Sequence, residues 1–325
     1  MTSVRSLLKW AGGKRQLLPA LRGYYPESFE RYCEPFLGSG AVFFDLHGDG
    51  RLEGKPARLT DVNGDLIGCY RMVRDEADAV IEQLAALAEE HRGRGADCYY
   101  DVRDLRFNPA RAALGDRRAT AYTPALAAML IYLNRTGYNG LFRLNRKGGF
   151  NVPAGRYVEP RICDAAHVRA VARAFGAPGV SIECAPFDAT LTAAGPGDFV
   201  YCDPPYAPLS ATSNFASYTA EGFSALDQRR LQRAVIGAAR RGAIVVVSNS
   251  SAAEIERAYT APAAQGAQLT VERVPARRAI NSRAGLRGPV EELVITNAGA
   301  VERLRMARAT LKPTRKWRNW QTRQT

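Results

Sequence analysis

Residues 199–206 constrain the fold of this chain more than any other segment. Their sequence, Phe-Val-Tyr-Cys-Asp-Pro-Pro-Tyr, begins with four apolar or aromatic residues, which is typical of a short buried strand. The strand must end at Pro204 and Pro205, because proline has no N–H to donate to a sheet and its φ is fixed. We therefore expect Asp203 and Tyr206 at the carboxyl end of a strand, where open α/β sheets bind ligands.

The Asp-Pro-Pro-Tyr sequence resembles the active-site loop of S-adenosylmethionine-dependent methyltransferases that act on the exocyclic amine of adenine. This amine is a poor nucleophile because its lone pair is delocalised into the ring. The Asp203 carboxylate and a rigid carbonyl near Pro204 would accept from its N–H groups and favour a pyramidal nitrogen. The Tyr206 ring would stack on the base. The alternative is a turn in which Asp203 only caps and Tyr206 only packs.

The composition indicates a globular protein with an anionic partner. The chain has 325 residues, 46% of them hydrophobic, which is enough for one large domain and a smaller one. The formal net charge of +13 suggests a nucleic-acid partner. The six cysteines form no Cys-x-x-Cys pair and the three histidines are far apart, so no zinc site or disulfide framework is indicated. Apolar stretches such as 125–133 are too short to cross a membrane, and we expect a cytoplasmic monomer.

Two glycine turns near the N-terminus indicate ligand sites, the first for an anion and the second, with Asp61, for a nucleoside-type cofactor. Lys-Trp-Ala-Gly-Gly-Lys, residues 9–14, precedes a helix-like segment whose free N–H groups would bind an anion, although the P-loop spacing is absent. The alternative there is a flexible start with one core tryptophan. Gly38 and Gly40 follow a short apolar strand, and Asp61 comes 21 positions after Gly40. A separation of ~20 is typical of a glycine turn and a ribose-binding acid in a nucleotide-binding βαβ unit.

The middle of the chain departs from α/β alternation. Helical patterns in 65–91, 99–107 and 124–133 predict an inserted, mainly helical domain. Residues 134–153 then predict a hairpin with its turn near 147–149. This segment combines Arg and Lys with aromatic residues and contains no acid, which suits phosphates and bases, although a solvated basic hairpin is the alternative.

Alternation resumes after the predicted hairpin. The expected elements are a helix at 164–175, a strand at 180–187, a helix at 224–241, a strand at 243–249 and an antiparallel pair at 268–274 and 291–296. From Leu269 to the end there are 13 Lys and Arg against 4 Glu. We expect the basic loop that contains Arg277, Arg278, Arg283 and Arg287 to meet phosphates, and the tail to be poorly ordered.

Six motifs in register resemble the bacterial DNA adenine methyltransferases of the Dam type, which form the D12 class in the alpha group of amino-methyltransferases. They are Lys-Trp-Ala-Gly-Gly-Lys, Glu-Pro-Phe-Leu-Gly-Ser-Gly, Thr-Asp-Val-Asn, Asn-Arg-Thr-Gly-Tyr-Asn-Gly-Leu-Phe-Arg, Gly-Phe-Asn-Val-Pro and Asp-Pro-Pro-Tyr-Ala-Pro-Leu-Ser. The resemblance covers residues 7–297. It implies an α/β fold with a Rossmann-like methyltransferase sheet, formed by 1–63 and 161–300, whose last strand is antiparallel. It also implies a mainly helical target-recognition domain, 64–160, that carries the hairpin, whereas the basic tail 301–325 is not covered.

The resemblance also implies the site residues. The catalytic set would be Asp203, Pro204, Pro205 and Tyr206. The S-adenosylmethionine site would be lined by Trp10, Lys14, Phe36, Gly38, Gly40, Asp61, Phe187 and Asp203, with Asp61 on the ribose hydroxyls. The DNA-binding set would be Lys9, Tyr138, Asn139, Leu141, Arg143, Pro153 and Tyr157. No metal is implied.

In the resembled family the substrate is double-stranded DNA with the site GATC, and the target adenine is flipped out of the duplex. Arg143 would read one guanine and Lys9 the other, since arginine binds guanine O6 and N7. Leu141 and Pro153 would meet a thymine methyl group. Two residues, Tyr138 and Asn139, would wedge beside the flipped base, and Tyr157 would support the hairpin.

Two other functions are weighed against this one. An RNA adenine or protein amide methyltransferase would more usually carry Asn-Pro-Pro-Tyr or Asn-Pro-Pro-Phe, so Asp203 and the hairpin argue against it. A DNA-binding regulator without catalysis would not need Asp203, Asp61 and Lys14 intact.

Overall fold

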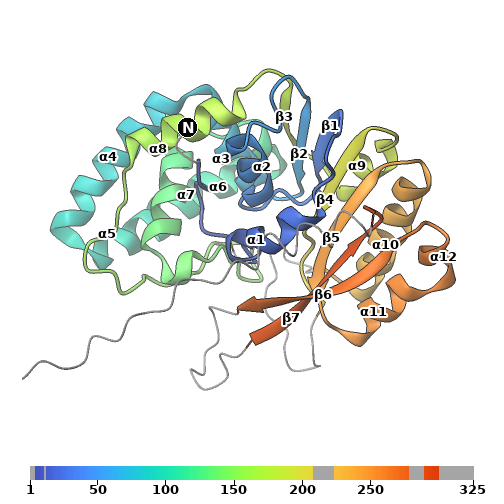
Figure 1. The fold of residues 1–325 in the computed structure, drawn as a ribbon. Helices are drawn as coiled ribbons and strands as arrows, with labels where there is room; N and C mark the ends of the chain where they lie inside the picture. The colour runs from blue at the N-terminus through green and yellow to red at the C-terminus, as the bar shows by residue number, and fades with distance from the viewer. Residues whose placement is uncertain (1–3, 11, 208–222, 278–288, 300–325) are drawn as a thin grey trace, which may run out of the picture.

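The computed structural model describes residues 4–10, 12–207, 223–277 and 289–299 (Figure 1). Within them a seven-stranded sheet has the order β3-β2-β1-β4-β5-β7-β6. The strands are β1 (Arg31–Glu34), β2 (Ala57–Asp61), β3 (Val180–Cys184), β4 (Asp198–Cys202), β5 (Ile244–Ser250), β6 (Thr270–Arg277) and β7 (Pro289–Thr296). Strands β1 to β5 pair in parallel, whereas β7 is antiparallel to β5 and β6. The predicted Rossmann-like sheet and its antiparallel last strand are confirmed.

Most predicted helices are also confirmed. The helices are α1 (Leu18–Leu21), α2 (Ala41–Gly48), α3 (Gly64–Asp75), α4 (Ala77–Arg94), α5 (Ala96–Asp101), α6 (Asn108–Leu114), α7 (Pro124–Thr136), α8 (Ala165–Phe175), α9 (Phe187–Ala193), α10 (Ala225–Arg240), α11 (Ala253–Thr260) and α12 (Pro262–Gln265). Side-chain caps explain several starts: Asn63 caps α3, Asp164 caps α8, and Ser224 caps α10 in a capping box with Asp227. The predicted strand 180–187 is shorter than expected, because α9 begins at Phe187 after Pro186.

The sheet is buried on both faces, and the residues of β4 show how. Phe199 and Tyr201 belong to the hydrophobic cluster on one side, where the Phe199 ring contacts Tyr25, Phe29 and Tyr32, whereas Val200 and Cys202 belong to the cluster on the other side, which includes residues of α9 and α10. Successive side chains of a strand point to opposite faces, so a strand covered on both faces is apolar at every position. This explains the continuous apolar run that precedes Asp203.

The helices α3 to α7 lie between β2 and β3 in the chain and to the left of the sheet in Figure 1. Helix α3 contacts β2 and β3 as well as α7. One hydrophobic cluster runs from the sheet through α3, α4, α5 and α7. None of these helices, nor any other helix in the described residues, is long and apolar enough to cross a membrane.

The predicted hairpin is confirmed at its turn, which lies at 145–149 between Leu144 and Phe150, but its two arms are not continuous strands. Its first residues, 134–136, end helix α7. The following segment, hereafter the 137–157 loop, contains only two isolated antiparallel bridges, Gly137 with Ala154 and Leu144 with Phe150. A continuous ladder cannot form because Asn139 has φ 54° and Gly140 has φ 64°, which is left-handed and not extended backbone.

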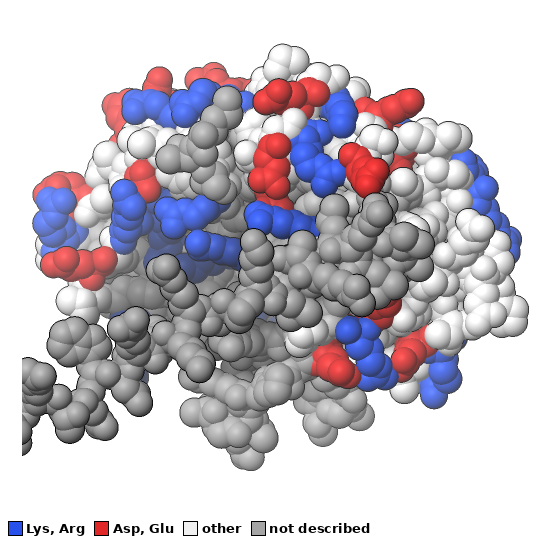
Figure 2. Space-filling model, in the orientation of Figure 1, with Lys and Arg blue, Asp and Glu red and all other residues white. Residues whose placement is uncertain are grey.

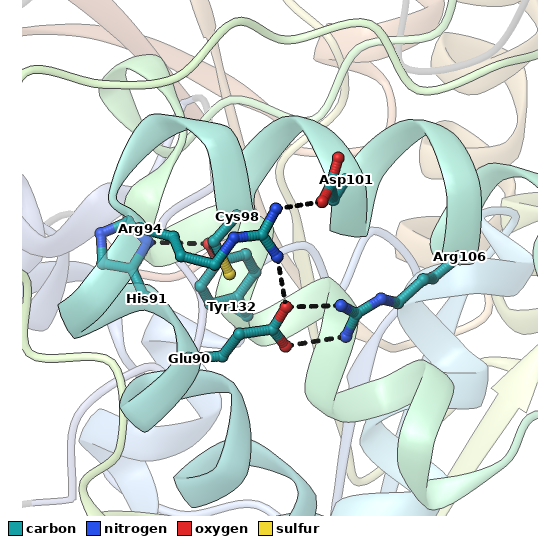
Figure 3. Close-up of polar contacts among 7 residues, drawn as sticks. All are labelled: Glu90, His91, Arg94, Cys98, Asp101, Arg106 and Tyr132. Atoms are coloured by element: carbon teal, nitrogen blue, oxygen red, sulfur yellow. Dashed lines mark hydrogen bonds and ion pairs between the residues drawn. The ribbon is translucent and has the colours of Figure 1, made fainter.

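Ion pairs hold α4 against the elements that follow it (Figure 3). Glu90 of α4 accepts from Arg94 and, with both carboxylate oxygens, from Arg106 at 2.9 and 2.5 Å. Arg106 belongs to η3 (Val102–Phe107), a π-helical segment between α5 and α6. His91 Nδ1 lies 2.8 Å from the Tyr132 hydroxyl of α7. These contacts therefore join helix α4 to both η3 and helix α7.

Two sequence predictions lie outside the described residues. They are most of the basic loop, with Arg278, Arg283 and Arg287, and the tail 301–325.

Candidate active site

The sheet reverses its direction of winding between β1 and β4, which are neighbours. From β1 the chain continues to β2 and β3 on one side, whereas β4 is followed by β5 on the other side. Such a switch point leaves a crevice outside the carboxyl ends of the two strands. Glu34 ends β1 and Asp203 follows β4, so both carboxyl groups lie at this edge.

Asp203 forms an ion pair with Lys14 at this edge. Lys14 Nζ lies 2.8 Å from Asp203 Oδ1, and their side chains are 6% and 20% exposed. The same ammonium group donates to the Gly12 carbonyl at 2.7 Å and lies 4.4 Å from the centre of the Tyr206 ring. Burial raises the pKa of Asp203 to about 6, although Lys14 opposes this shift. At neutral pH Asp203 is therefore a mostly ionised, mostly buried acceptor, and Lys14 contacts two of the four predicted catalytic residues, Asp203 and Tyr206.

The backbone after Asp203 is held by β5 and α10. Gln228 of α10 donates to the Pro205 carbonyl at 2.9 Å. At the end of β5, Asn249 Oδ1 accepts from the Ala207 N–H at 3.2 Å, and Ser250 Oγ donates to the Ala207 carbonyl at 2.7 Å. Asn249 Nδ2 also donates to Gln228 at 3.1 Å. These contacts hold residues 205–207 against β5 and α10, as a preorganised site requires.

Glu292 holds the ring of Tyr206. The Tyr206 hydroxyl donates to Glu292 Oε2 of β7 at 2.5 Å. Glu292 also raises the pKa of Asp203 through its negative charge. Sequence reasoning missed Glu292, Gln228, Asn249 and Ser250. The polar Ser-Asn-Ser ending of the apolar strand β5 was a usable signal, whereas Glu292 and Gln228 had none.

The glycine turn and Asp61 meet as the spacing predicts. The Gly38 N–H donates to Asp61 Oδ2 at 3.0 Å, and the Asn63 N–H donates to Asp61 Oδ1 at 2.9 Å. Burial raises the pKa of Asp61, and these backbone N–H groups oppose the shift. Gly38 and Gly40 have φ of +47° and +65°, and a Cβ at Gly38 would lie 3.1 Å from the Trp10 ring. Both glycines are therefore required by the backbone.

Three aromatic residues of the predicted cofactor set border this turn. Phe36 stacks on Phe187 with ring centres 5.3 Å apart. Trp10 stacks instead on Phe142 of the 137–157 loop, with ring centres 5.4 Å apart. Trp10 therefore links the glycine turn to the 137–157 loop, a contact that the sequence did not predict.

The predicted DNA-binding residues lie on the 137–157 loop and on the N-terminal segment beside it. Lys9, Tyr138, Asn139, Arg143, Pro153 and Tyr157 are exposed, and Leu141 is half-buried. The side chain of Asn134 accepts from the Lys9 N–H at 2.9 Å and donates to the Lys9 and Gly140 carbonyls at 2.7 and 2.8 Å. Lys9 Nζ lies 4.9 Å from the centre of the Tyr157 ring. The structure thus brings Lys9 to the loop.

Arg143 is already oriented in the structure. Its Nε donates to Asn151 Oδ1 at 2.9 Å, on the opposite side of the loop.

Figure 2 shows Lys and Arg side chains gathered beside a recess in the left half of the face, where the elements between β2 and β3 lie. In the described part of the chain, no group of three or more His, Cys, Asp and Glu side chains is placed to hold a metal ion.

The sequence of the chain matches a family model and is similar to several known proteins. A family model described as D12 class N6 adenine-specific DNA methyltransferase matches residues 10–273. The chain is 36% identical over 297 residues to the type II methyltransferase M1.LlaDCHI of Lactococcus lactis subsp. cremoris, covering 91% of this chain and 96% of that protein. It is 36% identical over 295 residues to a DNA adenine methylase of Vibrio cholerae, covering 90% and 96% of the two chains. For the DNA adenine methylase of Escherichia coli K12 the identity is 35% over 294 residues, covering 90% and 95%.

Proposed function

The chain belongs to the D12 class of N6 adenine-specific DNA methyltransferases, and from this we propose that it methylates the N6 amine of a flipped adenine in double-stranded GATC, with S-adenosylmethionine as methyl donor. The observation that carries the proposal is the Asp203 carboxylate, buried against Lys14 at the switch point, one strand away from the glycine turn bonded to Asp61. A hydrogen-bond acceptor for an amine and a site for a nucleoside cofactor would thus lie side by side at one edge of the sheet.

The residues around the glycine turn fit the cofactor. The Asp61 carboxylate accepts from the backbone N–H groups of Gly38 and Asn63, with a further contribution from Val62, and since two carboxylate oxygens offer about four acceptor positions, a ribose hydroxyl can still bind. The stacked rings of Phe36 and Phe187 would border the adenine of the cofactor. S-Adenosylmethionine supplies an activated methyl group on a sulfonium, so the protein needs to supply orientation and electrostatics only. We expect no metal to take part.

At the target amine, Asp203 would accept one N–H. We assign the second acceptor to the Pro204 carbonyl, because the Pro205 carbonyl already accepts from Gln228. Two fixed acceptors would favour a pyramidal nitrogen with its lone pair aimed at the methyl group. The base would stack on Tyr206, whose ring is held by Glu292. A strong general base is not required, because the nitrogen becomes acidic once it is methylated.

The 137–157 loop would read the DNA and hold the duplex open. Tyr138 and Asn139 are exposed at the start of the loop, where they would fill the space left by the flipped adenine. Unstacking costs a few kcal/mol, which stacking and phosphate contacts would offset. Arg143 and Lys9 would each meet a guanine, and Leu141 with Pro153 the thymine methyl. Residues 64–160 would then form the target-recognition domain on a catalytic domain of 1–63 and 161–300, and the enzyme would act as a monomer.

The test compares methylation of GATC with duplexes altered at one base pair at a time. Arg143→Ala should lose about 1–3 kcal/mol of discrimination at one base pair, whereas an arginine that binds only phosphate would weaken all sequences equally. Arg146→Ala is the matched control, because Arg146 is exposed on the same loop. Unchanged relative rates in Arg143→Ala would refute the assignment of Arg143 to a base. An adenine-containing RNA in the same assay tests the alternative substrate.

A further inference from the structure

A buried ion pair lies beneath the tip of the 137–157 loop, outside the residues assigned to DNA or cofactor. Arg111 of α6 donates through Nε to Asp65 Oδ2 of α3 at 2.8 Å, and the two side chains are 6% and 3% exposed. Through Nη1, Arg111 also donates to the Gly148 carbonyl at the loop tip. Arginine and aspartate are rarely buried unless paired. One guanidinium group therefore joins two helices to the loop.

The loop tip is held at two further points. Asn108 of α6 accepts from the Phe150 N–H at 2.8 Å and donates to the Phe150 carbonyl at 3.0 Å. Within the tip, Asn145 Oδ1 accepts from the Lys147 and Gly149 N–H groups at 2.9 and 3.0 Å. The bonds from Asn108 of α6 therefore fix the position of the loop tip, and the bonds to Asn145 fix the conformation of its turn.

Asp65, the partner of Arg111, is itself held in position by hydrogen bonds. Asp65 is in the first turn of α3, where the Asn63 side chain accepts from the Asp65 N–H at 3.1 Å. The Asn63 N–H in turn donates to Asp61, which is bonded to the glycine turn. Asp65 is thus positioned by the sheet edge that carries the proposed cofactor site. Arg111 connects this edge to the loop, because it bonds to both Asp65 and the Gly148 carbonyl.

We propose that Arg111, held by Asp65, is a positioning residue for sequence recognition: it fixes the Gly148 turn so that Arg143, on the opposite side of the Leu144–Phe150 bridge, meets its base pair. The inference rests on the proposed function, in which the 137–157 loop reads DNA. Arg111 itself is buried and contacts no base. Its loss should impair the binding and discrimination of DNA and leave the chemical step intact.

The experiment uses full-length Arg111→Met and the double variant Asp65→Leu/Arg111→Met. Removing Arg111 alone leaves the buried Asp65 with only the longer contact to Arg118, at 3.8 Å, whereas replacing both members of a buried pair with apolar residues is often neutral for stability. The double variant should therefore unfold near the parent temperature and still lack the bond to Gly148. We expect its KM for a GATC duplex to rise about tenfold and its discrimination at the base pair read by Arg143 to fall about fivefold or more. Its kcat and its KM for S-adenosylmethionine should stay within about threefold of the parent values.

Two further variants make the result interpretable. Arg106→Met is the matched control, since it removes a partly exposed ion pair between η3 and Glu90 of α4, and in the described part of the chain Arg106 makes no hydrogen bond or ion pair with the 137–157 loop. It should behave as the parent enzyme. Arg111→Lys keeps a charge for Asp65, so it should stay folded, but a lysine ammonium cannot span both acceptors as the guanidinium does. It should show the same rise in KM for DNA.

Parent-like KM for DNA and parent-like discrimination in a folded double variant, or in Arg111→Lys, would overturn the inference. So would a loss confined to kcat. The same panel includes Arg143→Ala, which separates the two proposals. If Arg143→Ala relaxes one base pair and the Arg111 variants do not, only the positioning role fails. If Arg143→Ala leaves the relative rates unchanged, the role of the loop in reading DNA fails.

Discussion

Replacement of Lys14 by methionine should move the pH dependence of methyl transfer. Lys14 is 5% exposed and its ammonium group lies 2.8 Å from Asp203, so its main electrostatic partner is that carboxylate and not a DNA phosphate. The pKa of Asp203 is raised by burial to about 6, with Lys14 holding it down. Asp203 therefore loses its negative charge as the pH falls through about 6. If the carboxylate accepts from the target amine, activity must fall in the same range.

The size of the effect follows from the charge that is removed. An opposite charge at this distance lowers a carboxyl pKa by about 1–3. Without Lys14 the acid limb of kcat/KM should therefore move from about pH 6 to roughly pH 7–9. At pH 7 the ionised fraction of Asp203 would fall from about 90% to between about 50% and 1%, so kcat/KM should fall about 2- to 90-fold.

The assay is the profile of kcat/KM from pH 5.5 to 9.5, which reports the pKa values of the free enzyme. Activity of Lys14→Met should recover as the pH rises, because the carboxylate forms again. Lys14→Arg keeps the positive charge and is the matched control, with an acid limb near that of the parent enzyme. A loss in Lys14→Met that is the same at every pH would show instead that Lys14 acts through some contact other than Asp203.

Three further results are expected. Glu292→Gln should move the acid limb to lower pH, opposite to Lys14→Met, because Glu292 raises the pKa of Asp203; a limb that does not move would show that Glu292 acts only through its bond to Tyr206. Asp203→Ala should abolish methyl transfer and keep DNA affinity within about tenfold, because the carboxylate meets the amine and not phosphate; normal turnover would contradict its catalytic role. Replacing exposed Arg146 and Lys147 together by Gln should reduce the slope of log affinity against log salt by about 2, since each phosphate contact contributes about 0.9; an unchanged slope would mean that these charges are only solvated.

The parts of the site that the sequence predicted are those encoded by neighbouring residues. The strand before Asp203 was visible because an apolar run and two prolines are local signals. The meeting of Gly38 with Asp61 was visible because a βαβ unit has a nearly fixed length. The structure adds contacts between segments far apart in the chain, such as the bond from Tyr206 to Glu292, 86 residues later. Which side chains meet across such separations depends on the order of strands, which periodicity does not specify.

Two differences have a local physical cause. The predicted hairpin is interrupted because Asn139 adopts a left-handed conformation, which asparagine tolerates better than most residues and which composition alone does not reveal. Residues 99–107 were predicted to be helical, but the π-helical geometry of η3 within them does not follow the period of 3.6 on which that prediction rests. Arg111 was not singled out, because an arginine in a helix is usually solvated. Its role became visible only when its burial against Asp65 was known.

Methylation of adenine in GATC is tested most directly by the identity and position of the methylated base. The enzyme is incubated with isotopically labelled S-adenosylmethionine and a duplex that contains one GATC site, and the DNA is then digested to nucleosides and separated by mass. Label should appear in N6-methyldeoxyadenosine from this duplex, fall sharply in duplexes altered at any one of the four base pairs, and be absent with Asp203→Ala. Label in methylated cytosine, or equal labelling of the altered duplexes, would contradict adenine methylation at GATC.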